Sequence, residues 1–114
     1  MKGRFGNKQR IEHALDVIVE IELYINNVTF ELFLADSMMR FACIKQLEII
    51  REAYNHVDVS VKEEFPAIEW RKIVGLRHLL VHEYFGVDAA LVRDIVTNNI
   101  PDLKVQLASV AETL

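Results

Sequence analysis

Apolar residues recur in this sequence at intervals of three and four residues, which is the spacing of one face of an α-helix. The clearest series consists of Ile11, Leu15, Ile18, Ile21 and Ile25. It predicts a helix from about Lys8 to Asn26, which ends at Asn26-Asn27 because Asn tolerates the left-handed backbone conformation of a helix C-terminus. The 114 residues include 4 Gly and 2 Pro, too few for a turn-rich β-sandwich or barrel. The chain is therefore expected to be all-α.

The next region carries the start signals of a short and a long helix. Thr29 precedes a short helical turn over residues 30–34. Asp36 or Ser37 is expected to cap a long helix that continues to about Asn55, since short polar side chains bond the free N–H groups of a helix start. The buried stripe of this long helix is expected to be Met39, Ala42, Cys43, Leu47, Ile50, Ala53 and Tyr54.

The second half of the chain is predicted to be helical as well. Within the connector 57–66, Ser60 and Glu63 have the spacing of a capping box for one short helical turn. Pro101 is expected to restart a helix, because proline is favoured in the first turn. The longer helices expected here span residues 68–83, 89–98 and 101–112.

One domain of ordinary size accounts for the whole chain. With 52% apolar and 26% charged residues, the composition is that of a globular protein. We expect residues 1–7 to form a basic N-terminal tail and residues 8–114 to form a single up-and-down bundle of four to five helices.

The charge is unevenly distributed along the sequence. Net charge is −4, which by itself argues against a nucleic-acid-binding protein. Residues 1–11 nevertheless carry +4, which is interpreted first as a solvated terminus. Residues 69–93 carry +1, so whole-chain charge is too coarse a measure to exclude RNA.

Two further features limit the type of protein. No apolar run approaches the roughly 18 residues of a membrane span, and the basic N-terminus lacks the apolar segment of a secretory signal. A cytoplasmic location is therefore expected, with no membrane partner. The single cysteine, Cys43, cannot form an intrachain disulfide and is expected to be a small buried apolar residue.

The candidate chemistry lies near the end of the predicted helix 68–83. Arg77, His78, His82 and Tyr84 fall within eight residues of an otherwise apolar stretch. His78 and His82 are four residues apart and could share a metal ion, but no H-E-x-x-H pattern supports a zinc site. A metal site is therefore the less favoured interpretation.

The same residues suit RNA cleavage without a metal. A histidine with a pKa near neutral can act as general acid or base, and Arg77 presents a planar fork that matches phosphate oxygens. Arg77 and His82 lie about 140° apart around an ideal helix, so a catalytic site would need two copies at a two-fold dimer interface. The structural alternative, which stays open, is that Arg77 pairs with a carboxylate such as Asp36 while His82 caps carbonyl groups.

These residues also resemble a known family. Arg77-x-x-x-x-His82-x-Tyr84 is similar to the R-x-x-x-x-H-x-Y motif of the HEPN superfamily, in its HepT-like toxin branch. Residues 70–77 and 80–88, which surround the motif, resemble that branch as well, as do residues 47–50 and 99–104. The similarity extends over about residues 8–112.

The resemblance implies a homodimeric, HEPN-like helical bundle that acts as a metal-independent endoribonuclease toxin and needs no cofactor. It implies that Arg77 and His82 serve RNA cleavage, and that Tyr84 receives AMP from an MNT-type nucleotidyltransferase antitoxin. Two positions depart from the family pattern. His78 replaces a small polar residue and is kept as an auxiliary site residue, and Arg51 replaces a glycine of the second long helix.

A second function, from a different class, is a non-catalytic helical dimer. In that case the Arg-His-Tyr motif is a surface that binds a nucleotidyltransferase partner and is modified by it. AMP attachment to a protein without ribonuclease activity would favour this alternative.

Overall fold

The computed structural model describes residues 4–66, 68 and 89–114, and all regular secondary structure in these residues is helical. The elements are α1 (Arg4–Ile25), α2 (Phe30–Ala35), α3 (Ser37–Asn55), α4 (Val59–Glu64), α6 (Ala89–Asp94), the π-helical turn η1 (Ile95–Asn99) and α7 (Ile100–Thr113). The all-α expectation is confirmed for the described residues.

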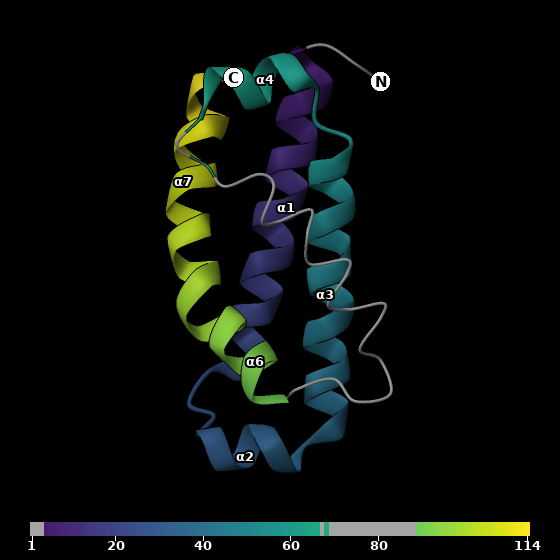
Figure 1. The fold of residues 1–114 in the computed structure, drawn as a ribbon, viewed down its shortest axis with the longest axis vertical. Helices are drawn as coiled ribbons and strands as arrows, with labels where there is room; N and C mark the ends of the chain where they lie inside the picture. Colours follow the sequence, from purple (N-terminus) through teal and green to yellow (C-terminus); the bar gives the residue numbers. More distant parts are fainter. Residues whose placement is uncertain (1–3, 67, 69–88) are drawn as a thin grey trace.

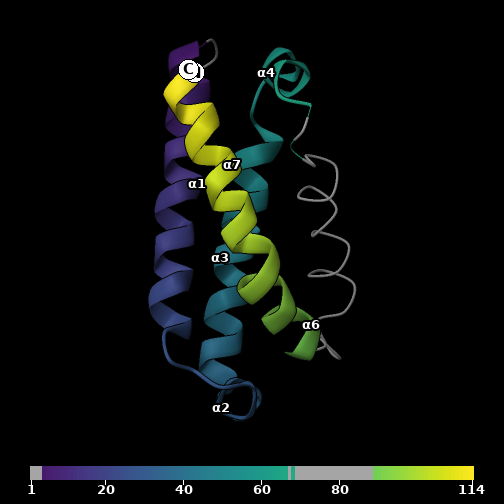
Figure 2. The same ribbon diagram turned by 90° about the vertical axis from the view of Figure 1, so that its left-hand side faces the viewer.

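Three long helical segments lie side by side along the longest axis (Figures 1 and 2). α1 runs in one direction, and α3 and α7 run in the other. α1 packs against both α3 and α7, and the short helices α2 and α4 lie at opposite ends of this arrangement. Among the described residues, no helix combines the length and apolarity needed to cross a membrane.

The start of α1 differs from the sequence prediction. The helix begins at Arg4 rather than Lys8, so it reaches into the segment expected to be a basic tail. Asn7 explains the extension, because its side chain is 3% exposed and contacts a distant part of the chain. Its Nδ2 donates to Asp58 Oδ2 at 3.1 Å, and its Oδ1 accepts from the Asp58 backbone N–H at 3.0 Å. We call this reciprocal pair the Asn7–Asp58 clamp.

The signals between α1 and α3 act as predicted. Asn27 adopts a φ of 59°, so the left-handed residue after α1 is confirmed. The Thr29 hydroxyl accepts a hydrogen bond from the Leu32 N–H at 3.2 Å and caps α2. Asp36 caps α3 by accepting from the Met39 N–H at 3.0 Å. Local capping chemistry therefore determines these helix boundaries.

The predicted capping box of the connector is wrong. α4 begins at Val59, which places Ser60 inside the helix, and the residue at the cap position is Asp58. The Asp58 side chain makes no capping bond to α4, and one of its carboxylate oxygens accepts from Asn7 instead. A long-range contact thus replaces the local motif.

The C-terminal region also differs from the prediction of two separate helices, 89–98 and 101–112. α6, η1 and α7 follow one another without a gap. Pro101 accounts for the π-helical turn, because proline has no N–H and its ring crowds the carbonyl four residues earlier. In this turn the Ile100 N–H donates to the Ile95 carbonyl, five residues back, and the helical path continues past the proline.

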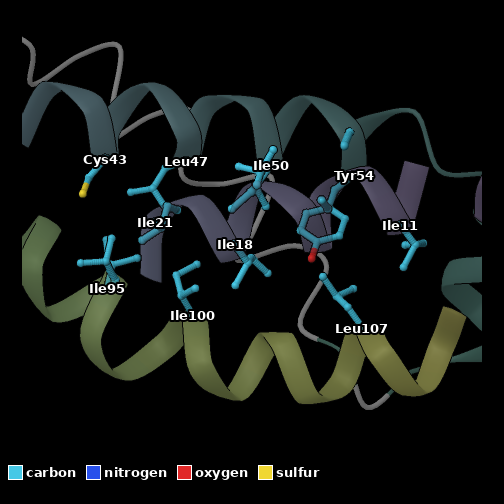
Figure 3. Close-up of a cluster of buried hydrophobic side chains, with 14 of the residues drawn as sticks. Ile11, Ile18, Ile21, Cys43, Leu47, Ile50, Tyr54, Ile95, Ile100 and Leu107 are labelled. Carbon is cyan, nitrogen blue, oxygen red and sulfur yellow. The ribbon is translucent and has the colours of Figure 1, made fainter. Parts of the chain in front are cut away.

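The interior is an apolar seam between α1, α3 and the segment formed by η1 and α7 (Figure 3). The labelled buried side chains are Ile11, Ile18, Ile21, Cys43, Leu47, Ile50, Tyr54, Ile95, Ile100 and Leu107. Most of the predicted α3 stripe is buried as expected, whereas Met39 and Ala42 are half-buried. The α1 series is likewise buried except for Leu15 and Ile25, which are partly buried at its edge.

Candidate functional site

The four residues that the sequence singles out for chemistry lie outside the described residues. Arg77, His78, His82 and Tyr84 all fall within residues 69–88, so their roles stay predictions. The structure does place Asp36, the carboxylate considered as a partner for Arg77. Its Oδ1 caps α3, and the side chain is exposed.

The described residues on either side of this segment belong to different ends of the molecule. Ile68 is buried, and its N–H donates to the Phe65 carbonyl just after α4. Ala89 begins α6, which packs against α2 and α3. α4 and α6 lie near opposite ends of α3 (Figure 1).

A surface groove lies between α1 and α3. It has a volume of about 440 Å³. Its lining residues are Gly6, Gln9, Arg10 and His13 from α1, Ile49, Glu52 and Ala53 from α3, and His56, which directly follows α3. On each helix these residues follow the spacing i, i+3, i+4, i+7, which is one face of a helix over two turns. We call this feature the α1/α3 groove.

The charged groups of the groove fall into two sets. On α3, Glu52 Oε1 lies 2.9 Å from His56 Nε2, and Glu52 Oε2 lies 2.9 Å from Arg51 Nη2. On α1, Arg10 and His13 make no hydrogen bond or ion pair with any other described residue. The α3 wall thus carries a satisfied carboxylate, while the α1 wall presents a half-buried arginine and an exposed histidine.

Sequence reasoning missed this groove. The +4 N-terminal segment was interpreted as solvated, and no signal within α1 alone indicates a partner helix. One usable signal exists: Arg10 and His13 are three residues apart and Glu52 and His56 are four apart, so each pair shares a helix face. The pairing of the two faces follows from the antiparallel packing of α1 on α3, which local spacing does not reveal.

Two buried groups of the interior are unsuited to chemistry. Cys43 is 0% exposed, and burial raises the pKa of its thiol from 9.0 to about 11. The thiol is therefore protonated near neutral pH and is a poor nucleophile. This agrees with the prediction that Cys43 is a small buried apolar residue. Burial also raises the pKa of the Tyr54 hydroxyl. Across residues 4–66, 68 and 89–114, no three His, Cys, Asp or Glu side chains gather to hold a metal ion.

Residues 14–110 match the family model described as "Ribonuclease HepT-like". The chain belongs to the HepT-like ribonuclease family. The match includes Arg77, His82 and Tyr84, so the predicted motif lies inside the family region. The resemblance to the HepT-like branch, which rested on that motif and its surroundings, is confirmed.

Named relatives support the membership in the HepT-like family. "Probable ribonuclease HepT" of Thermococcus cleftensis is 38% identical over 99 residues, which cover 87% of this chain and 90% of that protein. "Putative RNase MJ1380" of Methanocaldococcus jannaschii is 37% identical over 94 residues, which cover 82% of this chain and 83% of that protein. The aligned regions therefore include most of each chain.

A third relative of this HepT-like chain has a longer sequence. "Gamma-glutamylcyclotransferase and putative RNase MJ0434" of Methanocaldococcus jannaschii is 32% identical over 104 residues, which cover 91% of this chain and 47% of that protein. The HepT-like region thus also occurs as about half of a larger protein. No solved structure matches this chain significantly.

Proposed function

We propose that this protein is a metal-independent endoribonuclease. The observation that carries the proposal is the HepT-like family match over residues 14–110, which contains Arg77 and His82. The names of the relatives, which call them RNases, point to the same substrate class. A histidine supplies a general acid or base and an arginine stabilises phosphate charge, and these two functions are sufficient for RNA cleavage without a metal.

The reaction uses the 2′-hydroxyl of the RNA as its nucleophile. His82 takes the proton of this hydroxyl as a general base, and the oxygen attacks the adjacent phosphorus. The bond from phosphorus to the 5′-oxygen of the next nucleotide breaks, and a general acid protonates that oxygen. Arg77 stabilises the negative charge on the phosphoryl oxygens of the transition state. The products carry a 2′,3′-cyclic phosphate and a 5′-hydroxyl.

A homodimer supplies both the base and the acid. On the helix predicted over residues 68–83, Arg77 and His82 of one chain would not share a face, because five residues correspond to about 140° of rotation in an ideal helix. A two-fold axis brings a second copy of each residue to the same catalytic site at the dimer interface. One His82 then acts as base and the other as acid. His78 is proposed to orient the phosphate or its neighbouring histidine.

The proposed regulation is modification of Tyr84 by an MNT-type nucleotidyltransferase antitoxin. The tyrosine oxygen attacks the α-phosphorus of ATP, AMP is joined to the tyrosine, and pyrophosphate leaves with the electron pair of the broken bond. The attached AMP adds a negative charge and bulk two residues from His82. It therefore competes with RNA phosphate for Arg77 and blocks access of the strand.

The test is cleavage of a fluorescent RNA in the presence of EDTA. The wild-type dimer is expected to cut the RNA, and His82→Ala is expected to lose at least about a hundredfold in rate, the usual contribution of a general base. Lys62→Ala, which removes a half-buried cation of α4, is the control and keeps the wild-type rate. Undiminished cleavage by the double variant Arg77→Ala, His82→Ala would refute the mechanism. AMP attachment to a wild-type protein that cuts no RNA would establish the non-catalytic alternative.

A further inference from the structure

Arg10, on α1, differs from three cations of α3 and α7 that form ion pairs with carboxylates. Lys45 pairs with Glu48 at 3.9 Å, Arg51 with Glu52 at 2.9 Å, and Lys104 with Glu22 at 2.8 Å. Arg10 is a half-buried residue that lines the α1/α3 groove, and its side chain has no carboxylate partner among the described residues. A guanidinium without a carboxylate partner can bind an anion through its N–H groups, so the Arg10 part of the groove is suited to an anionic ligand.

The shape of the groove indicates more than an ion site. Its volume of about 440 Å³ lies within the range of ordinary ligand pockets. Gly6, Ile49 and Ala53 give it an apolar lining, while Gln9, Glu52 and the histidines supply polar groups. A ligand that combines an anionic group with a flat, partly apolar body matches this lining.

The order of the side chains along the groove favours an extended ligand. Because the Asn7–Asp58 clamp joins the start of α1 to the residues just after α3, His56 lies near the Gly6 end of the groove. His13 lies two helical turns further along α1, about 10 Å away in axial distance. Arg10 lies between His56 and His13 along the groove. The groove therefore presents one permanent cation between two imidazole rings, both of which are exposed.

We propose that the α1/α3 groove binds a nucleotide unit of a single-stranded RNA, which rests on the proposed ribonuclease function because the strand is its substrate. The planar guanidinium of Arg10 binds a backbone phosphate through parallel hydrogen bonds. The rings of His13 and His56 offer faces on which unpaired bases stack, and histidine is one of the side chains that serve this purpose. A carboxylate of an acidic peptide would satisfy Arg10 but would leave the two rings unused. The groove-lining residues belong to segments 6–13 and 49–56, so they are different residues from the Arg77–Tyr84 motif.

Binding of a cleavage-resistant RNA tests the proposal directly. The probe is a short fluorescein-labelled 2′-O-methyl oligouridylate, which cannot react because its 2′-oxygen is blocked. Fluorescence anisotropy of the wild-type protein and Arg10→Gln is compared at several salt concentrations. Arg10→Gln is expected to raise Kd about tenfold and to reduce the slope of log K against log salt by about 0.7, the loss of one phosphate contact on a single strand. His13→Ala, at an exposed position, is expected to raise Kd about fivefold through lost stacking.

Lys8→Gln is the matched control, because it removes the same charge from the same helix. Lys8 is half-buried, does not line the groove and lies about 200° around α1 from Arg10. It is expected to leave Kd within about twofold of wild type, since it makes no groove contact. Equal effects of Lys8→Gln and Arg10→Gln would refute a specific site, as would wild-type affinity in both Arg10→Gln and His13→Ala.

Three further outcomes separate this inference from related ones. Displacement of the oligonucleotide by free uridine monophosphate at equal nucleotide concentration would overturn the strand proposal, because the groove would then be a mononucleotide site. A wild-type protein that cuts RNA in EDTA, combined with unchanged binding in both groove variants, would refute the groove and leave the ribonuclease proposal intact. A wild-type protein that neither binds nor cuts RNA would refute both.

Discussion

The two sides of the α1–α3 pair have opposite chemical character. On the side that faces α7, Ile18, Leu47 and Ile50 are 0% exposed and contribute to a continuous apolar interior. On the side that faces solvent, the same two helices present Arg10 and Glu52 along the groove. A charged group in the interior would lose its hydration without compensation, whereas one in the open groove keeps part of it.

This difference separates stability from binding within one pair of helices. Apolar burial on the inner side provides the free energy that keeps α1 and α3 together. The outer side then holds polar groups in fixed positions at little cost to that free energy. Substitutions on the inner side are expected to change stability, and substitutions such as Arg10→Gln on the outer side are expected to change RNA affinity.

The largest stability effect is expected for Leu47→Ala. Leu47 is fully buried between α1, α3 and α7, so its truncation removes apolar contacts and leaves a cavity, at a cost of about 3 kcal/mol in the free energy of unfolding. Leu23→Ala is the matched control, because Leu23 is 65% exposed on α1 and its truncation is expected to cost less than about 0.5 kcal/mol. Urea denaturation measures both. Equal costs would contradict the distinction between the two sides.

An intermediate effect is expected at the Asn7–Asp58 clamp. Asn7→Ala removes both hydrogen bonds to Asp58 from a side chain that is 3% exposed, at a cost of about 2 kcal/mol. The control Asn98→Ala removes an exposed bond to Asp94 and is expected to cost less than about 0.5 kcal/mol. Thermal unfolding followed by circular dichroism compares the two. A Tm for Asn7→Ala equal to that of the control would show that the clamp does not hold the start of α1.

The smallest effect is expected for the ion pair that links α7 to α1. Lys104 Nζ lies 2.8 Å from Glu22 Oε1, with about two-fifths of each side chain exposed (41% and 39%). Such pairs contribute little because water screens the charges, so Lys104→Ala is expected to cost less than about 1 kcal/mol. The double variant with Glu22→Ala completes a thermodynamic cycle, measured in urea. A coupling free energy above about 2 kcal/mol would contradict this ranking.

Features that depend on neighbouring residues were predictable from the sequence. The caps Thr29 and Asp36 and the left-handed Asn27 act within a few residues of their positions, and their signals were interpreted correctly. The length of α3 followed from its cap and its apolar spacing. Local chemistry is sufficient at these places, because no distant contact competes with it.

Features that depend on distant contacts were not predictable. The sequence near Asn7 and Asp58 contains no sign that these residues, 51 positions apart, bond to each other. That bond extends α1 to Arg4 and replaces the capping box expected at Ser60. The α1/α3 groove was missed for the same reason, since it exists only where two helix faces meet.

Pro101 illustrates a different limit. The sequence rule that proline interrupts a helix is correct about the hydrogen bond that is lost. The rule does not specify whether the helix ends before the proline or continues through a wider, π-helical turn. Burial of Val96 within the turn and of Ile100 directly after it favours the continuous path, because both residues reach the interior without a break in the helix.

In the proposed reaction, the HepT-like motif cuts RNA through the RNA's own 2′-hydroxyl. Mass spectrometry of the RNA ends produced in EDTA tests this claim most directly. We expect fragments with 2′,3′-cyclic phosphate and 5′-hydroxyl ends, and we expect them to disappear when His82→Ala replaces the wild-type protein. Fragments with 3′-hydroxyl and 5′-phosphate ends would contradict it, because those ends require water rather than the 2′-hydroxyl as the nucleophile.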